Sequence, residues 1–166
     1  MTTAAAPSAL RAWVAATRPA TLWAAVVPVA VGLAVAAEHG PLEPLVATAS
    51  LAVALLLQLA SNFANDAADG ERGVDGPDRL GPARAVAMGW LSSKQMKRAA
   101  VVCVACALVV GGWLAVIGGP ILLAVGAAAV VCALAYTAGP VPLGYIGLGD
   151  FLVLLFFGVT AVCGTY

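Results

Sequence analysis

Long apolar runs with almost no charge most constrain what this chain can fold into. Of its 166 residues, 63% are hydrophobic and 10% are charged, whereas a soluble domain averages roughly 25% charged residues. The mean hydropathy is +1.02. The apolar stretches are continuous and do not alternate with a period of two, so they predict membrane-spanning helices and not strands. We therefore expect an all-α integral membrane protein.

Glycine and proline clusters divide this apolar sequence into five predicted membrane spans within one membrane domain, residues 1–166. The spans lie at about residues 21–37, 44–69, 93–117, 120–137 and 148–166, with hydrophilic loops at about 70–92 and 138–149. Ser92 and Gln95 have the spacing of a capping box at the start of the third span. The fifth run is still apolar at Tyr166, which favours an N-terminal portion of a longer protein.

The distribution of basic residues predicts the orientation. All eight Lys and Arg lie before the first span or between the second and the third. The positive-inside rule places both of these segments in the cytoplasm, and the parity of the spans adds the loop at about 138–149. We expect a multi-pass protein of the plasma membrane with its N-terminus and motif-bearing loops cytoplasmic. The net charge is zero, so nothing indicates a nucleic-acid partner.

A polar stretch, NFANDAADGERGVD at residues 62–75, follows the second apolar run. At about 100° per residue, four oxygen-bearing side chains share an arc of about 100° on one helix face. They are Asn62, Asn65, Asp66 and Asp69. Carboxylate and amide oxygens without His or Cys suit Mg²⁺, which completes its shell with water and substrate phosphate oxygens. The stretch indicates a Mg²⁺-bridged phosphate or diphosphate site, or alternatively a solvated helix end that uses Asn and Asp for turn chemistry.

Four segments together resemble the UbiA-type membrane prenyltransferases. The polar stretch looks like the first aspartate-rich motif of that family. The other three are similar to its branch that acts on 1,4-dihydroxy-2-naphthoate: TRPATLWAAVVPVAVG (17–32), GPARAVAMGWLS (81–92) and YTAGPVPLGYIGLGDFLVLLFFGVTAVCGTY (136–166). The four segments occur in the family's order and extend over most of the chain.

The resemblance implies a UbiA-type helical bundle with nine spans when complete, of which about five are present here. In that family, two aspartate-rich motifs at the cytoplasmic end hold Mg²⁺ and the prenyl diphosphate. The second motif does not occur before Tyr166. We therefore expect half of such a centre in this chain, and no prenyl transfer by residues 1–166 alone.

The implied reaction moves a polyprenyl group from prenyl diphosphate to 1,4-dihydroxy-2-naphthoate, with loss of its carboxylate, to give demethylmenaquinone. The resemblance gives catalytic and metal-binding roles to Asp66 and Asp69, and further metal-binding roles to Asn62 and Asp75. The implied substrate-binding residues are Arg18, Asn65, Arg84, Lys94, Tyr136 and Tyr145.

Several alternatives stay open. The acceptor could be 4-hydroxybenzoate or a tetrapyrrole, or the chain could be a non-catalytic truncated homologue or a cation-binding membrane protein. A transporter is disfavoured because the acidic cluster lies at one membrane face and not at the midplane. Arg18 and Lys94 would otherwise serve membrane topology, and the two tyrosines would be interfacial anchors. Cys103 and Cys106 form a CxxC without companion ligands, which is typical of core packing. Neither the prenyl chain length nor the oligomeric state follows from the sequence.

Overall fold

The computed structural model describes residues 7–73, 84–137, 147 and 149–166, and all regular secondary structure in them is helical. In chain order the elements are α1 (Ala9–Thr17), α2 (Pro19–His39), α3 (Pro44–Arg72), α4 (Ser93–Gly118), α5 (Pro120–Thr137), α6 (Gly149–Val153), the π-helix η2 (Leu154–Thr160) and α7 (Ala161–Thr165). The prediction of an all-α protein is confirmed for these residues.

Three of these helices, α2, α3 and α4, are long and apolar enough to cross a membrane. Their most apolar stretches have mean hydropathies of 2.1, 1.8 and 2.7. Two further apolar stretches, Pro120–Cys132 and Phe151–Thr165, are shorter. Large apolar side chains also face outward, among them Val116 on α4, which is 86% exposed. Such a surface is stable in lipid and not in water, so the protein is embedded in a membrane.

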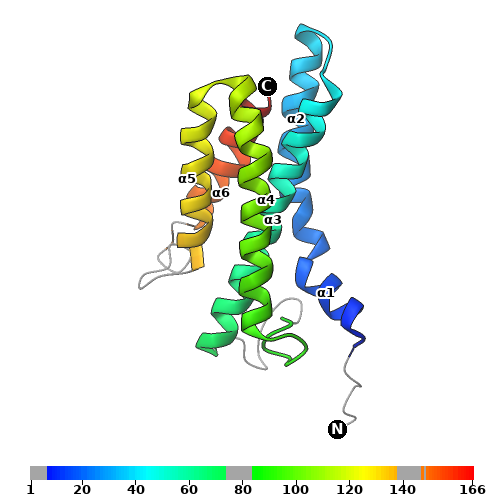
Figure 1. Ribbon diagram of the computed structural model, residues 1–166, viewed down its shortest axis with the longest axis vertical. Coiled ribbons are helices and arrows are strands. Elements are labelled where there is room, and N and C mark those ends of the chain that lie inside the picture. Colours follow the sequence, from blue (N-terminus) through cyan, green and yellow to red (C-terminus); the bar gives the residue numbers. More distant parts are fainter. Residues whose placement is uncertain (1–6, 74–83, 138–146, 148) are drawn as a thin grey trace.

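The long helices run alongside one another, and the chain reverses at two opposite ends of the molecule (Figure 1). The α2–α3 and α4–α5 turns lie at one end. The other end, here called the polar end, is formed by α1, the carboxyl end of α3, residues 84–91 and the amino end of α4. Since α3 packs more extensively against α4 than any other two elements pack together, this pair forms the centre of the bundle.

A small core holds the polar end together. It is formed by buried side chains from α1, α3, residues 84–91 and α4, namely Ala12, Ala16, Phe63, Ala67, Ala85, Leu91, Met96 and Ala100. Trp13 packs edge-on against Phe63, with ring centroids 6.0 Å apart. Because five of these eight residues are alanines, the helix backbones can approach closely. The core therefore fixes α1 and the start of α4 around α3.

Local sequence signals set most helix starts. Proline is the first residue of α2, α3 and α5, a position where its missing N–H has no helical partner to lose. At α4, Ser92 Oγ accepts the Gln95 N–H at 3.3 Å, and Gln95 Oε1 accepts the Ser92 N–H at 2.8 Å. The capping box predicted at these two residues is confirmed.

The end of α3 differs from the expected one, because the helix continues past residue 69 to Arg72. Gly70 does not end the helix. A Cβ atom at Gly70 would lie 2.4 Å from Cγ1 of Val86, so this glycine permits close packing against the turn before α4. The helix ends instead at Gly73, whose φ of 63° is in the left-handed region.

The packing of α7 against α2 generates the first prediction. A Cβ atom at Gly32 would lie 2.6 Å from the Val162 carbonyl oxygen and 2.9 Å from Cβ of Thr165. We expect Gly32→Ala to lower stability by about 1–3 kcal/mol, because a backbone oxygen cannot rotate away and α7 must shift. Thermal unfolding in lipid nanodiscs measures the effect.

Gly112→Ala is the matched control, since a Cβ atom at this α4 glycine meets nothing within 4 Å. This control should be neutral or stabilised by up to about 1 kcal/mol through its helix propensity. A Gly32→Ala protein as stable as the Gly112→Ala protein would contradict the placement of α7.

Candidate functional site

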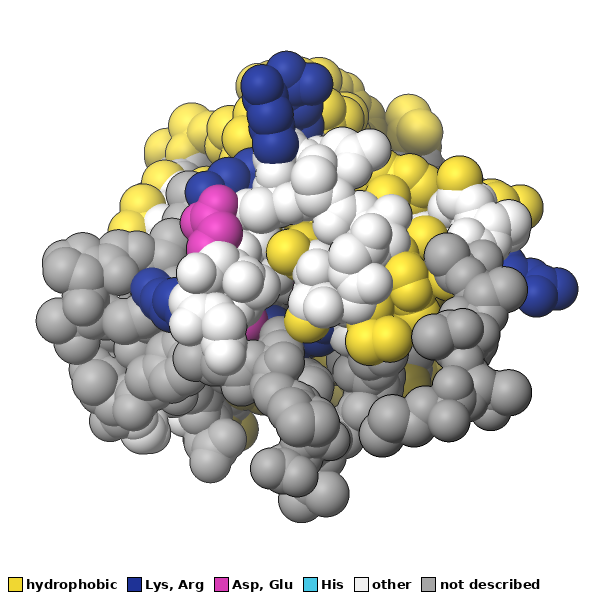
Figure 2. All heavy atoms as spheres, turned by 90° about the horizontal axis from the view of Figure 1, so that it is seen from below, with side chains coloured by type: hydrophobic (Ala, Val, Ile, Leu, Met, Phe, Trp, Pro, Cys, Tyr) yellow, Lys and Arg dark blue, Asp and Glu magenta, His cyan; other side chains and the backbone are white. Residues whose placement is uncertain are grey.

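Every described Lys and Arg lies on the segments that meet at the polar end. Figure 2 looks onto this end, where, among the described residues, basic side chains are spread over the face and little acidic surface is visible. Among the described residues, the exposed acid there is Glu71, whose carboxylate accepts hydrogen bonds from Lys97 Nζ at 2.6 and 2.8 Å and from Ser93 Oγ at 2.6 Å. In contrast, Asp66 and Asp69 are only 1% and 4% exposed. Residues 66–69, called the acidic stretch below, are therefore mostly inside the protein.

Asp66 binds the backbone of the turn that precedes α4. Its Oδ2 accepts the Ala85 N–H at 3.1 Å, and its Oδ1 accepts the Val86 N–H at 3.2 Å. The turn closes on itself through the Trp90 N–H, which donates to the Ala85 carbonyl at 2.8 Å. The carboxylate caps the first N–H groups of this turn, as an Asp does at a helix N-terminus. Asp66 thereby holds residues 84–91 against α3.

Arg84 connects the same turn to α3 a second time. Its Nη1 donates to Asp69 Oδ2 and, at 2.8 Å, to the carbonyl oxygen of Asn65. The side chains of Arg84 and Asp69 are 10% and 6% exposed, so this ion pair is almost buried. Removing one partner of a buried pair leaves an uncompensated charge, which destabilises by about 3–5 kcal/mol. The cation and the carboxylate are thus held in one arrangement.

Asn62 connects α3 to the corner between α1 and α2. Its Nδ2 donates to the Thr17 carbonyl and to Thr21 Oγ1, both at 2.9 Å. Its Oδ1 accepts a longer hydrogen bond, 3.4 Å, from Gln58 Nε2. The corner itself requires a left-handed Arg18, with φ 49°. The Asn62 amide therefore positions α1 and α2 beside the acidic stretch.

A cavity of about 730 Å³ opens next to these groups, between α2, α3, α4, α5 and the segment from α6 to α7. Most of its lining is Ala, Val, Leu and Phe. Near the acidic stretch the lining becomes polar, through Arg18, Thr21, Gln58, Ser61, Asn62 and Asn65. Asp66 and Asp69 lie outside this lining and contact residues 84–86. An apolar cavity with a polar end suits an amphiphile with a hydrocarbon chain.

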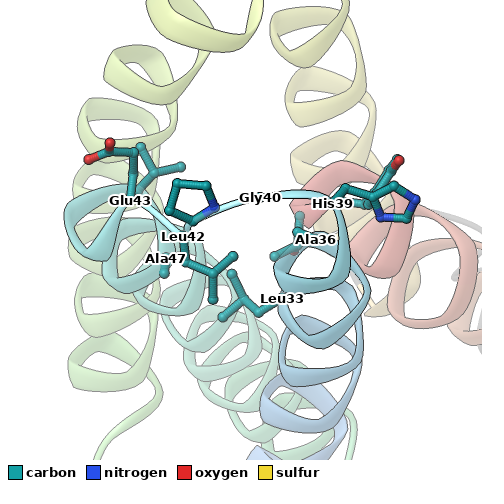
Figure 3. A pocket seen from close by; sticks show the side chains of 11 residues that line it. Leu33, Ala36, His39, Gly40, Leu42, Glu43 and Ala47 are labelled. Carbon is teal, nitrogen blue, oxygen red and sulfur yellow. The ribbon is translucent and has the colours of Figure 1, made fainter.

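A smaller pocket of about 450 Å³ lies at the opposite end, where α2 turns into α3 (Figure 3). His39 and Glu43 lie at its rim, and apolar side chains such as Leu33 and Leu42 lie between the two helices. About 20 residues of α3, or roughly 30 Å, separate this pocket from Asp66. It is therefore no part of the site at the polar end.

The structure brings some of the predicted site residues together. Asp66, Asp69 and Arg84 meet at the turn before α4, and Asn65 joins them through its carbonyl oxygen. Lys94 is exposed on the first turn of α4. Tyr136 belongs to α5, but its side chain is not described, and Asp75 and Tyr145 lie outside the described residues.

The two carboxylates fit a divalent cation by their chemistry. Mg²⁺ is bound by one or two protein carboxylates plus waters and substrate phosphate oxygens, and each carboxylate has about four lone-pair sites. Residues 7–73, 84–132, 147 and 151–166 contain no group of three or more His, Cys, Asp or Glu that could hold a metal. Asp66 and Asp69, one helical turn apart, thus fit a cation that arrives with a phosphate. The metal-binding role of Asn62, whose amide contacts three other residues, stays a prediction.

Gln58 and the backbone N–H groups of Ala85 and Val86 belong to the site although no motif includes them. Backbone donors carry no sequence signal. Gln58 does carry a sequence signal, because it is a polar residue inside an apolar run and lies one helical turn before Asn62.

The chain is similar to known proteins along most of its length. The model of the UbiA prenyltransferase family matches residues 25–166. The 1,4-dihydroxy-2-naphthoate octaprenyltransferase of Escherichia coli (strain K12) is 40% identical over 165 residues, 96% of this chain and 54% of that protein. The enzymes of that name from Mycobacterium tuberculosis (strain ATCC 25618 / H37Rv) and Bacillus subtilis (strain 168) are 40% and 29% identical, over 92% and 86% of this chain and 52% and 45% of theirs. The chain spans about half the length of these relatives, and no solved structure gives a significant match.

The contacts of Asp66 generate a prediction about structure. In Asp66→Asn, one carboxylate oxygen becomes an NH₂ group that faces a backbone N–H and cannot accept its hydrogen. The unsatisfied donor should weaken the turn by about 1–3 kcal/mol. Hydrogen–deuterium exchange of a peptide covering Ala85 and Val86 should be faster than in the wild type.

Glu71→Gln is the matched control, because it makes the same change to an exposed acid of the same helix. Exchange at Ala85 and Val86 should be unchanged in this variant. Equal exchange in the Asp66→Asn variant and this control would show that Asp66 does not hold the turn.

Proposed function

We propose, because this chain belongs to the UbiA prenyltransferase family, that it forms part of an intramembrane enzyme that transfers a polyprenyl group. The donor is a prenyl diphosphate and the acceptor is 1,4-dihydroxy-2-naphthoate, which loses its carboxylate as CO₂ while the diphosphate leaves, so that the immediate product is the quinol form of demethylmenaquinone. The names of the relatives supply the acceptor. The observation that carries the proposal is the apolar cavity whose polar end adjoins the Asp66, Asp69 and Arg84 group.

The two ends of the donor match the two parts of the site. A polyprenyl chain is pure hydrocarbon, and the cavity offers it an apolar lining that includes Phe156 and Phe157. A diphosphate is a multiply charged anion, and Arg84 provides a guanidinium at the adjacent polar end. Lys94, exposed nearby, and Arg18, in the cavity lining, add positive charge on the same side. The donor would therefore lie with its head at the polar end and its chain in the cavity.

Asp66 and Asp69 would hold Mg²⁺ with the diphosphate. When bound there, the metal supplies Lewis-acid stabilisation of the negative charge that develops on the leaving diphosphate. The residues of this chain contribute fixed geometry, since Asp66 is held by two backbone N–H groups and Asp69 by Arg84. The apolar cavity walls exclude water from the reacting allylic carbon, so that the electron-rich ring attacks it instead.

We also propose that the polar end faces the cytoplasm of a plasma-membrane protein. The support is that every described Lys and Arg lies on the segments that meet there, as the positive-inside rule requires. In this arrangement the two shorter apolar stretches complete five spans, as the sequence predicts. The diphosphate then enters from the cytoplasmic side and the prenyl chain from the bilayer.

The reaction generates the third prediction, which is tested with the protein that carries this chain. Purified in lipid nanodiscs, it should transfer a radiolabelled prenyl group to 1,4-dihydroxy-2-naphthoate in the presence of Mg²⁺, and a chelator should abolish the transfer. Asp66→Ala and Asp69→Ala should each lower turnover by roughly 100-fold or more, because each removes charge stabilisation at the leaving group.

Glu71→Ala serves as the control for removal of an acid from α3, and it should retain turnover. Offering 4-hydroxybenzoate in parallel tests the acceptor class. Transfer to that compound in preference to the naphthoate would contradict the proposed acceptor, and full turnover by Asp66→Ala would contradict the proposed site.

A further inference from the structure

We infer that Gln58 determines acceptor specificity by hydrogen bonding to a ring hydroxyl of the aromatic acceptor. The inference rests on the proposed function, since it assigns a contact within the same cavity. It concerns a residue that lies outside the acidic stretch, near the carboxyl end of the apolar run of α3.

The burial of Gln58 is unusual for an amide. The side chain is 8% exposed and forms part of the cavity lining, among leucines, valines and alanines. Gln58 uses only part of its hydrogen-bonding capacity within the protein, through Asn62, and each polar group that is left unsatisfied on burial costs roughly 1–3 kcal/mol. A leucine would fill the same position without this cost. The amide is therefore explained best by a partner that enters the cavity.

The orientation of the Gln58 amide follows from its neighbour. The Thr17 carbonyl can only accept a hydrogen bond, so the Asn62 atom 2.9 Å from it must be the nitrogen. The other terminal atom of Asn62 is then the oxygen, an acceptor. The Gln58 atom that faces this oxygen at 3.4 Å must therefore be a donor, Nε2. The oxygen Oε1 of Gln58 consequently points elsewhere.

Gln58 thus keeps one acceptor and one donor for a ligand. Within the part of the chain that the structure describes, Oε1 has no hydrogen-bond partner, and the second hydrogen of Nε2 has none either. This combination favours a ligand group that both donates and accepts hydrogen bonds. A polyprenyl chain has no polar atom, and diphosphate and carboxylate oxygens only accept hydrogen bonds, so none of them can satisfy Oε1. A phenolic hydroxyl donates and accepts, and it therefore matches both free positions.

The place of Gln58 along α3 agrees with such a contact. Gln58 precedes Asn65 and Asp66 by two helical turns, which is roughly 10–12 Å along the axis. With the diphosphate at the acidic stretch, the allylic carbon lies just inside the cavity, and the acceptor ring must lie beside it. A hydroxyl of that ring can then reach Gln58 while the ring faces the carbon that it attacks.

The experiment replaces Gln58 with methionine, which has a similar volume and no amide. In Gln58→Met, the KM for 1,4-dihydroxy-2-naphthoate should rise roughly threefold to tenfold, the equivalent of one neutral hydrogen bond. The KM for prenyl diphosphate should not change. A residue with a merely structural role would change both constants together.

A second measurement on the wild-type protein does not depend on the folding of a variant. Inhibition constants are determined for 1-hydroxy-2-naphthoate and 4-hydroxy-2-naphthoate, each of which lacks one ring hydroxyl. One of the two should bind the wild type roughly threefold to tenfold more weakly than the other. Gln58→Met should bind both equally well.

The control is Thr48→Val, which also removes a polar group from α3 but lies outside the cavity lining. It should leave both KM values unchanged. If the wild type transfers no prenyl group, the proposed function fails. If it does transfer one, an unchanged acceptor KM in Gln58→Met, a parallel rise of both KM values, or equal wild-type binding of the two inhibitors would each overturn the role of Gln58.

Discussion

The polar end depends on the interaction of the buried Asp66 carboxylate with the turn before α4. A carboxylate beside apolar helices is strongly disfavoured unless it has partners, and here its partners are the backbone N–H groups of Ala85 and Val86. These two hydrogen bonds position the turn that leads into α4, and the capping box at Ser92 then starts that helix. Asp66 thus positions the amino end of α4 against α3, and the packing of these two helices forms the centre of the bundle.

One face of α3 contacts two environments in succession. Asp66 and Asp69 bind the turn before α4, whereas Gln58, Asn62 and Asn65, which precede them on the same helix face, line the cavity. The two sets follow one another along about three turns of one helix. A ligand with a charged head and an apolar chain would therefore contact both sets at once, which explains why the polar residues cluster where the apolar run of α3 ends.

Much of this fold follows from the sequence, because its determinants are local. Prolines mark three helix starts, the capping box marks a fourth, and the apolar runs predict the long helices. The helical spacing also placed the acidic residues on one face of α3, but spacing cannot identify what that face contacts. Gly70 shows the limit, since a glycine after an acidic run is typical of a helix end, whereas here it lies inside the helix and its lack of a side chain makes room for Val86. The partners of Asp66 are backbone groups of Ala85 and Val86, which no residue pattern reveals.

The contacts that fix the site lie within this chain, which spans about half the length of its relatives. Arg84 is bound to Asp69 and to the Asn65 carbonyl, and Asp66 is bound to the same turn, so contacts between α3 and residues 84–86 help to define where these charges lie. Groups that stabilise a developing charge are most effective when they need not rearrange during the reaction. Held by this network, Arg84 and the two carboxylates would present fixed charges to an incoming diphosphate. The buried ion pair is then best understood as the means by which the charges are oriented, and less as a source of stability.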